Sequence, residues 1–363
     1  MKIGILTFHR AENFGAVFQC FALQTYLESC GHEVKVIDYR CRAIEQVYYL
    51  FNPMSLFLRF NLIFAAIDYI KRLVNYKDRL RKKKQYISFR NKYLNLTKSI
   101  HSISKDLGFD VYVVGSDQVW NVKLLHGYNK MYFCDFPVSP EAKLITYAVS
   151  SDISGVNALK DFETQIKCTL EKLNSISVRE RYFAEALTMY TSKQVHVCVD
   201  PTLLIDKDIY LRMAVKPKET KYILVYHVSE IPEGSKAADV LAGETQTEII
   251  EIHAAFAKRN DNRRHKQNLG PLEILGYIAY ADYVITSSFH GLAFSLIMNK
   301  DFCVFANNNV RIANLLESIG LTDRITHSAE KIPQTSINYN LIQDNIENVL
   351  STSKDYLSTA LQK

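Results

Sequence analysis

Short apolar runs alternate with helical stretches along this chain, and this alternation constrains its fold more than any other feature. The chain opens with an apolar run at 3–6, a helical stretch at 16–29 and a second apolar run at 34–37. Strand, helix and strand at this spacing predict a right-handed βαβ unit of a parallel sheet. The loop 13–15 then lies at the carboxyl end of the first strand, where open α/β sheets bind ligands.

The same alternation returns later in the chain and predicts two domains. A length of 363 residues exceeds what one hydrophobic core usually organises. We therefore expect an α/β protein with two Rossmann-like domains that face a cleft, residues 1–205 and 206–335, and a C-terminal helix, 336–363, that packs back on the first domain. The expected strands lie at 111–114, 144–148, 175–178, 195–199, 222–226, 248–252, 283–286 and 302–305, and the expected helices of the second domain lie near 272–280, 291–299 and 310–318.

Residues 42–100 interrupt the alternation and predict a helical insertion in the first domain. Aromatic residues are frequent in its first part, and its second part has ten lysines and arginines but one acid, Asp78, from Lys71 to Lys92. The whole chain has a formal charge of +6, so the rest of it is slightly acidic and we expect no nucleic-acid partner. The basic run is either the solvated face of an ordinary helix or a surface for anionic lipid or a lipid-pyrophosphate carrier.

Cysteine usage and the N-terminal segment indicate a cytoplasmic protein. The seven cysteines are scattered without a CxxC pair or a Cys/His cluster at metal spacing, which is typical of free thiols in a reducing compartment. The first residues turn polar too early for a signal peptide, and polar residues interrupt the apolar stretch 51–70. Because nucleotide-binding, P-loop, zinc-hydrolase and nucleophile-elbow motifs are missing from the sequence, we expect no metal and no bound cofactor.

The segment 281–295, ADYVITSSFHGLAFS, holds the most informative residues. A buried strand delivers Ser287, Ser288 and His290 to its carboxyl end, and Gly291 opens the next helix. Free N–H groups at the helix start, together with the serine hydroxyls, predict an anion site. His290 can then serve as a cationic donor or a general acid near neutral pH, or it only caps its own loop.

Arg179 carries a second signal. It follows the strand 175–178 and begins a helix, where a cation opposes the helix dipole. Either it faces an anionic ligand, or it pairs with Glu180 or another local acid.

Weaker signals lie at the ends of two other strands. Asp117 can orient a sugar hydroxyl, act as a base or cap the following turn, and Trp120 can stack on a sugar face. Gly15, two residues after Asn13, either admits close approach of a ligand to the backbone or only makes a turn.

Taken in order, five segments resemble the polysaccharide pyruvyl transferase family. They read ILTFHRAENFGAVFQCFALQTYL, VYVVGSDQVWN, ISVRE, VCVDPTLL and ADYVITSSFHGLAFSLIMNKDF. The resemblance covers residues 1–40 and 108–306 and leaves out the insertion. It implies a fold similar to that of GT-B glycosyltransferases, phosphoenolpyruvate as co-substrate, and transfer of pyruvate as a ketal onto two sugar hydroxyls.

The resemblance also implies roles for individual residues. His290 matches the histidine of the family's Arg-Leu-His or Ser-Phe-His motif and would be the general acid. Arg179 matches the arginine of its Val-Arg-Glu segment and would hold the donor, and Asp117 would be the base. The expected donor-binding residues are Asn13, Gly15, Arg179, Ser287, Ser288, Phe289, His290 and Gly291, and the expected acceptor-binding residues are Asp117, Gln118, Trp120 and Asn121.

One departure from the family pattern concerns the donor site. Ser288 stands where other branches carry an arginine, so a cation for the donor is missing from that position. Lys300, Arg263 and Arg264 are the candidates to replace it.

The resemblance suggests as acceptor a hexose, often galactose or N-acetylmannosamine, in a capsular, cell-wall or exopolysaccharide unit on a lipid carrier. That acceptor would bring the enzyme to the inner face of the membrane. Two other functions stay open. One is a nucleotide-sugar-dependent glycosyltransferase of the same architecture, and the other is a non-catalytic protein that binds an anionic metabolite or scaffolds a glycan-assembly complex.

Overall fold

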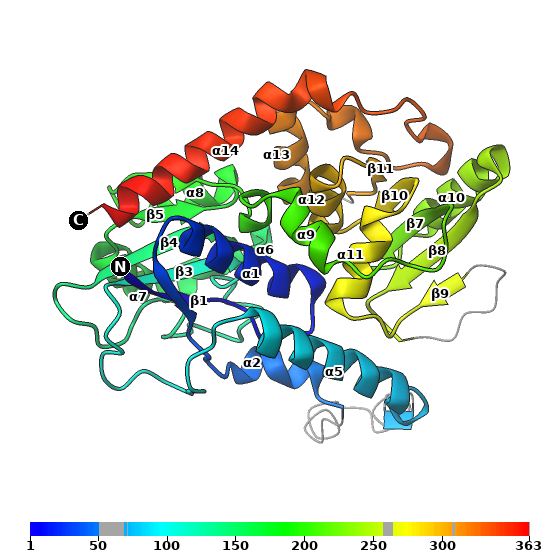
Figure 1. The fold of residues 1–363 in the computed structure, drawn as a ribbon. Helices are drawn as coiled ribbons and strands as arrows, with labels where there is room; N and C mark the ends of the chain where they lie inside the picture. Colours follow the sequence, from blue (N-terminus) through cyan, green and yellow to red (C-terminus); the bar gives the residue numbers. More distant parts are fainter. Residues whose placement is uncertain (51–68, 71, 257–263, 307–308, 363) are drawn as a thin grey trace. The chain divides into compact units, whose positions relative to one another are not determined.

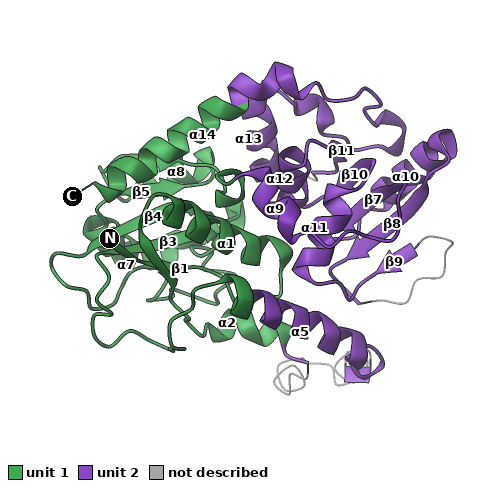
Figure 2. Cartoon of the chain, in the orientation of Figure 1, with its two compact units in different colours: residues 1–48, 90–205, 346–363 green, residues 49–89, 206–345 purple. Residues whose placement is uncertain are grey.

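The computed structural model contains two parallel β-sheets, each in its own compact unit (Figure 1). The first unit comprises residues 1–48, 90–205 and 346–363, and the second comprises 49–89 and 206–345 (Figure 2). The predicted α/β class with two parallel sheets is confirmed. The structure describes residues 1–50, 69–70, 72–256, 264–306 and 309–362.

The first sheet has six strands in the order β2-β1-β3-β4-β5-β6. Its central strands are nearly continuous apolar runs because helices and loops cover both faces of a parallel sheet. The strands are β1 (Lys2–Leu6), β2 (Glu33–Val36), β3 (Val111–Asp117), β4 (Lys143–Val149), β5 (Ile176–Val178) and β6 (Val195–Val197). The helices are α1 (Phe14–Ser29), α2 (Arg42–Glu45), α6 (Ile153–Asn157), α7 (Glu163–Lys172) and α8 (Arg181–Leu187), with short 3-10 turns η1 (Gln46–Tyr48), η2 (Ala158–Phe162) and η3 (Pro201–Leu203).

The second sheet has five strands in the order β11-β10-β7-β8-β9. Thr286 of β10 pairs with Tyr226 of β7 and with Val304 of β11, so the carboxyl ends of these three strands share one edge. The strands are β7 (Tyr222–His227), β8 (Glu248–His253), β9 (Arg264–Lys266), β10 (Tyr283–Thr286) and β11 (Asp301–Val304). The helices are α9 (Lys207–Met213), α10 (Pro232–Thr245), α11 (Pro271–Ala279), α12 (Phe289–Ile297) and α13 (Val310–Ile319), with 3-10 turns η4 (Thr322–Arg324) and η5 (Ala329–Lys331).

Helix α5 (Tyr76–Tyr93) contains most of the basic run, and its residues up to Phe89 belong to the second unit. Arg81 and Gln85 donate hydrogen bonds to the Glu273 carboxylate of α11 at 2.7 and 2.6 Å. These contacts explain why the segment 49–89 clusters with the second sheet, whereas we expected the whole insertion in the first domain.

The long helix α14 (Tyr339–Leu361) ends on the first unit. The Tyr356 hydroxyl donates to the Thr146 carbonyl at 2.7 Å, and the Ser353 hydroxyl accepts from the Val199 N–H at 2.9 Å. Leu357, the next residue of the helix, is also buried. Residues from the C-terminal end of the helix therefore complete the packing around β4 and the segment after β6.

Candidate functional site

Polar side chains follow four neighbouring strands at the carboxyl edge of the first sheet. Asp117 ends β3, Ser150 follows β4, Arg179 follows β5, and Asp200 lies three residues after β6. Parallel pairing places Asp117 level with Val149, so these positions share one edge. Arg179 and Asp117 were predicted as site residues from the sequence. Ser150 and Asp200 were not, although each is an early polar residue after a predicted strand.

Arg179 pairs with acids of its own unit. Its Nη1 donates to Asp200 Oδ2 at 2.7 Å, its Nε to Glu180 Oε1 at 3.0 Å and its Nη2 to Ser150 Oγ at 2.9 Å. Burial alone would lower the pKa of Arg179, but Glu180, Asp200 and Asp117 outweigh burial and raise it. The guanidinium is 4 % exposed and faces three carboxylates. Of the two interpretations of Arg179, the structure shows the pairing with local acids. It gives no support to a direct contact between Arg179 and the donor.

Asp117 is the member of this group that a ligand can reach. Its side chain is 15 % exposed, and its Oδ1 lies 4.0 Å from Arg179 Nη2. Its backbone has a φ of 71°, in the left-handed region that Asp tolerates, and its carbonyl accepts from the N–H groups of Val119 and Ser150, both at 2.8 Å. The main chain is thus held from both sides while the carboxylate faces the sheet edge.

In the turn after Asp117, two of the residues predicted to bind the acceptor have buried side chains. Trp120 is buried, stacks on Phe133 with ring centroids 5.3 Å apart, and donates from Nε1 to the Tyr132 carbonyl at 2.8 Å. It cannot stack on a sugar because both of its faces lie in the core. Asn121 is also buried, and its amide donates to the Gln118 side chain at 2.8 Å. The prediction that Trp120 and Asn121 contact the acceptor is therefore wrong, and Gln118 is tied to the turn.

Asn13 and Gly15 belong to the start of α1. The Asn13 side chain caps the helix by accepting from the Ala16 N–H at 3.1 Å, and Gly15 is buried in the first turn. Their positions are explained by helix capping and packing. A contact with the donor stays a prediction for both.

The loop from β10 to α12 places His290 in the first turn of α12, at the carboxyl edge of the second sheet. Ser288 is the N-cap residue, and its hydroxyl accepts from the Gly291 N–H at 3.1 Å. The Ser288 N–H in turn donates to Thr286 Oγ1 at 3.0 Å. Ser287 donates to the Ser229 carbonyl at 3.5 Å, so the loops after β10 and β7 adjoin. Ser288 and Gly291 therefore form the helix cap. His290 is half-buried, and its contact with the donor stays a prediction.

Gly291 is required by packing. A Cβ on this residue would lie 2.5 Å from Thr286 Oγ1 and 2.9 Å from Tyr226 Cδ1. Phe289 beside it is buried as well. Both predicted donor-binding residues thus hold α12 against the ends of β10 and β7.

None of the described candidates replaces the missing cation. Lys300 immediately precedes β11. Because Asp301 pairs with Tyr283, the first residue of β10, Lys300 lies at the amino ends of the strands, whereas Ser288 lies beyond their carboxyl ends. Arg264 pairs with Glu248 at 2.8 Å. Arg263 lies outside the described residues.

Arg311 is a cation that the sequence analysis missed. It is the second residue of α13, which follows β11, and it is half-buried with its Nε donating to Asn309 Oδ1 at 3.3 Å. An arginine between a strand and the body of the next helix is the same signal that drew attention to Arg179, which the structure places two residues before α8. Because β11 neighbours β10, Arg311 lies at the same sheet edge as His290.

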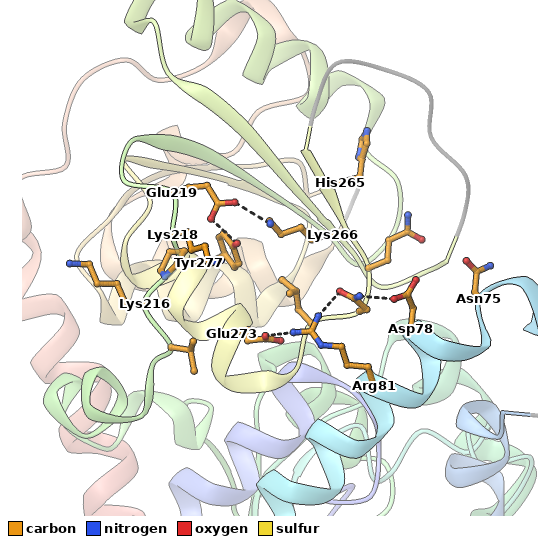
Figure 3. Close-up of a pocket in the computed structure, with 15 residues that line it drawn as sticks. Asn75, Asp78, Arg81, Lys216, Lys218, Glu219, His265, Lys266, Glu273 and Tyr277 are labelled. Atoms are coloured by element: carbon orange, nitrogen blue, oxygen red, sulfur yellow. Dashed lines mark hydrogen bonds and ion pairs between the residues drawn. The ribbon is translucent and has the colours of Figure 1, made fainter.

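A separate pocket of about 590 Å³ lies within the second unit (Figure 3). Residues of α5, of the segment 215–219 and of the segment 265–277 line it. Its charged groups pair with one another, as between Arg81 and Glu273 at 2.7 Å and between Lys266 and Glu219 at 3.1 Å. It contains none of the predicted site residues, and its paired charges of both signs do not resemble the expected anion site.

Some lysines of the basic run contact other parts of the second unit, and others are exposed to solvent. Lys82 donates to the Ala254 carbonyl at 3.3 Å and lies over the Phe256 ring, whereas Lys77, Lys84 and Lys92 are exposed. Lys71, where the run begins, is outside the described residues. None of the helices that the structure describes combines the length and apolar character needed to cross a membrane.

The family model for polysaccharide pyruvyl transferases matches residues 13–309, which is most of the chain. The chain belongs to the polysaccharide pyruvyl transferase family. The match includes strands and helices of both units. It contains four of the five segments on which the resemblance rested and the first segment from Asn13 onward, whereas β1 precedes it. The family confirms the expectation of a transferase enzyme in polysaccharide biosynthesis.

Similar solved structures include sugar-nucleotide epimerases and a glycosyltransferase. The UDP-GlcNAc 2-epimerase from Neisseria meningitidis bound to UDP-GlcNAc is 10% identical with a TM-score of 0.49, over 100% of this chain and 95% of that one. A putative UDP-N-acetylglucosamine 2-epimerase from Listeria monocytogenes is 10% identical with a TM-score of 0.49, over 97% and 90%. The glycotransferase of kitacinnamycin is 13% identical with a TM-score of 0.44, over 98% and 95%. These similarities are too low to support a conclusion about function, and no curated protein matched the chain.

Proposed function

We propose that this pyruvyl transferase moves the enolpyruvyl group of phosphoenolpyruvate onto two hydroxyls of a hexose in a lipid-linked polysaccharide repeat unit. The products are a pyruvate ketal and phosphate. The observation that carries the proposal is the position of His290, a proton donor in the first turn of α12 within the region matched to the family. Helix N-termini favour anions through their N–H groups and dipole, and phosphoenolpyruvate is a small multiply charged anion.

On the donor side, His290 is the general acid of the proposal. It protonates the methylene carbon of phosphoenolpyruvate, which becomes a methyl group and leaves an oxocarbenium-like centre at the neighbouring carbon. Arg311, at the same edge of the second sheet, supplies the cation that Ser288 does not. Its guanidinium is suited to a phosphate or carboxylate group because it offers paired N–H donors.

On the acceptor side, Asp117 is the base. One sugar hydroxyl attacks the cationic carbon and gives up its proton to Asp117, the bond from that carbon to the phosphate oxygen breaks, and the second hydroxyl then closes the ketal. The two hydroxyl protons balance the one taken up by the methylene carbon and the one that leaves with phosphate. Arg179 acts here as a positioning residue, because its Nη2 lies 4.0 Å from Asp117 and its other contacts hold the guanidinium in place.

The test is mass spectrometry of a panel of aryl hexosides incubated with the full chain and phosphoenolpyruvate. The expected product is heavier than the sugar by one pyruvic acid less one water, and it is absent with His290→Gln but present with His327→Ala, an exposed histidine of the same unit. Parallel incubations with nucleotide sugars test the glycosyltransferase alternative. Product from a nucleotide sugar, or none from any acceptor together with no binding of phosphoenolpyruvate, would overturn the proposal.

The exposed lysines of α5 are the proposed contact with anionic membrane, where a lipid-linked acceptor resides. Each lysine near an anionic surface contributes about 1 kcal/mol, so three suffice for weak and salt-sensitive association. In liposome flotation, the chain should rise with vesicles containing anionic lipid but not with neutral vesicles. Replacing Lys77, Lys84 and Lys92 with glutamine should abolish flotation, and replacing the exposed Lys160, Lys216 and Lys354 should not. Equal flotation of both triple variants would contradict the contact.

A further inference from the structure

Three histidines and a glutamate gather at the carboxyl end of β7 and β8, outside the residues assigned above. His227 pairs directly with His253 across these strands, and Glu251 pairs with His265 of β9. Glu251 and His253 are two residues apart on β8, so their side chains point to the same face of the sheet. The register of the strands and the alternation of side chains along β8 together bring the four side chains into one cluster.

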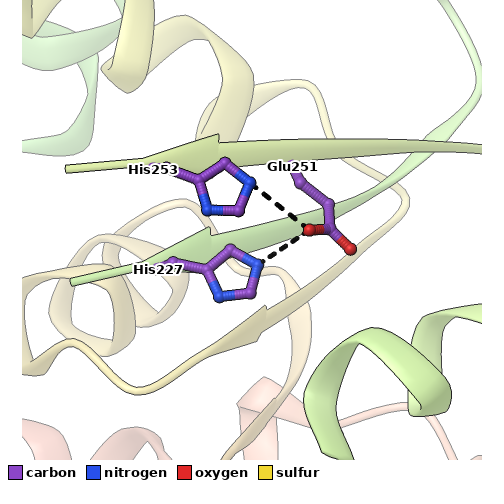
Figure 4. Close-up of side chains that lie close together, drawn as sticks. All are labelled: His227, Glu251 and His253. Atoms are coloured by element: carbon purple, nitrogen blue, oxygen red, sulfur yellow. Dashed lines mark hydrogen bonds and ion pairs between the residues drawn. The ribbon is translucent and has the colours of Figure 1, made fainter. Parts of the chain in front are cut away.

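The ligand atoms of three members of this cluster, His227, Glu251 and His253, converge (Figure 4). His227 Nε2 lies 3.1 Å and His253 Nε2 lies 3.4 Å from the same oxygen, Oε2 of Glu251. His265 Nδ1 lies 3.6 Å from that oxygen and 2.9 Å from His253 Nε2. In a tetrahedral site with metal–ligand bonds near 2.0–2.1 Å, ligand atoms are about 3.4 Å apart. The observed spacings bracket this value.

Protonation strengthens the case for a cation. His253 Nδ1 lies 3.1 Å from Glu230 Oε1, an acceptor, so in the neutral ring this nitrogen carries the proton and Nε2 presents a lone pair. That lone pair faces the Glu251 carboxylate. Two electron-rich groups directed at each other in a buried site require a proton or a metal ion between them. Without metal, an N–H on His265 Nδ1, 2.9 Å from His253 Nε2, can supply that proton. The contact from Glu230 also has the form of the carboxylate–histidine pairs that orient metal ligands.

We propose that His227, Glu251 and His253 bind a divalent transition-metal ion of the zinc type, with His265 beside the fourth coordination position. All three ligand residues are 2 % exposed, and their ligand atoms lie within 4.8 Å of one another. Two imidazoles and a carboxylate are a ligand set typical of zinc, and their borderline-soft nitrogens disfavour Mg²⁺ and Ca²⁺.

Such an ion would stabilise the part of the second sheet next to the donor site. The Ile231 N–H donates to His227 Nδ1 at 3.3 Å, so without metal Nε2 carries the proton and donates it to Glu251. When the ion takes the place of that proton, the ring proton moves to Nδ1, 3.9 Å from Glu230 Oε2, and the hydrogen bond from the Ile231 N–H is given up. The loop after β7 also adjoins Ser287, so the ion fixes the edge of the sheet from which α12 begins.

Metal content and thermal unfolding test the proposal without any activity assay. The full chain is stripped with a chelator, dialysed, incubated with Zn²⁺ and desalted. We expect retention of about one ion per chain, a higher unfolding temperature with Zn²⁺ than with Mg²⁺, and, with Co²⁺, the strong visible absorption of a four-coordinate site.

Glu251→Gln and His253→Ala should lose the ion and the rise in unfolding temperature, and His327→Ala should keep both. Glu251→Gln preserves the shape of the side chain and its ability to accept a hydrogen bond, so circular dichroism separates lost binding from lost folding. If the wild-type chain retains no Zn²⁺ and its unfolding temperature does not change, the cluster holds a proton and the proposal is overturned. Retention by both variants would place the ion elsewhere, for example at the exposed Cys30 and Cys168, and would equally overturn it.

Discussion

The first turn of α12 serves packing and chemistry with adjacent residues. His290 is the general acid of the proposed reaction, whereas Gly291, one position later, lets the helix approach Thr286 and Tyr226 closely. The two residues can therefore be separated by experiment, because one substitution acts on the reaction and the other on the free energy of unfolding.

Replacing His290 with glutamine removes the acid but keeps a polar side chain of similar size. We expect the turnover number to fall by about 10²–10⁴-fold, the usual contribution of a positioned acid, with the unfolding temperature unchanged. The turnover number is measured as the rate of phosphate release from phosphoenolpyruvate in the presence of acceptor. A variant with full activity would remove His290 from the mechanism.

Replacing Gly291 with alanine forces a Cβ into contacts of 2.5 and 2.9 Å. We expect a loss of about 1–3 kcal/mol in the free energy of unfolding, measured with urea. Gly243 of α10 is the matched control, because a Cβ there would meet nothing within 4 Å. Gly243→Ala should gain about 0.5–1 kcal/mol through helix propensity. Equal stability of the two variants would contradict the packing role.

Single residues also show where sequence patterns mislead. The position of His290 after a buried strand is a local property, and the sequence predicts it. The burial of Trp120 depends on Phe133, Tyr132 and Phe183, which are up to 63 residues away. The pairing of Arg179 with Asp200 likewise depends on the neighbouring strand, and the spacing of charges along the chain does not reveal it.

At the scale of elements, continuous apolar runs were the reliable signal. Val111–Asp117 and Lys143–Val149 are buried on both faces, so their hydrophobic pattern alone predicts them. Strand β9 was missed because its three residues are Arg, His and Lys, and only pairing with β8 makes them a strand. The same strand brings His265 to the histidine cluster. The proposed ligands His227 and Glu251 are themselves on two different strands and far apart along the chain, so no ligand spacing in the sequence marks them.

Helix α14 offers a matched test of how a terminal element is held. Leu357 is 1 % exposed and packs on the first unit, whereas Leu341 of the same helix is 78 % exposed. Leu357→Ala should lower the free energy of unfolding by about 2–5 kcal/mol, and Leu341→Ala should change it by less than about 0.5 kcal/mol. Urea unfolding monitored by circular dichroism gives both values. A small effect at Leu357 would mean that the helix end is not part of the core.

At the scale of the whole molecule, a buried carboxylate links the stability of the first unit to pH. Burial alone would raise the pKa of Asp38, but hydrogen bonds from His9, Arg10 and Ser99 outweigh it and hold the pKa far below its ordinary value of 3.8. A carboxyl group with a lowered folded-state pKa stabilises the protein above its unfolded-state pKa, and this stabilisation is lost as the pH falls further.

The free energy of unfolding should therefore decline as the pH falls below about 4. Asp38→Asn should be less stable than the wild type at pH 7 and should lose less stability on acidification. Urea unfolding curves at pH 7, 4 and 3 measure the difference. Parallel pH dependence of the two proteins would show that Asp38 is not a source of acid sensitivity.

The path of the chain through the two units has a consequence for its synthesis. The chain passes to the second unit after residue 48, returns at 90, leaves again after 205 and returns at 346. Ribosomes synthesise a protein from its N-terminus, and most domains fold as soon as their own segment has emerged. Here the six strands of the first unit emerge early, but Tyr356 and Leu357, which pack against this unit, are translated only after all five strands of the second sheet. The surface of the nascent first unit that binds α14 therefore stays uncovered until the entire second sheet has been synthesised.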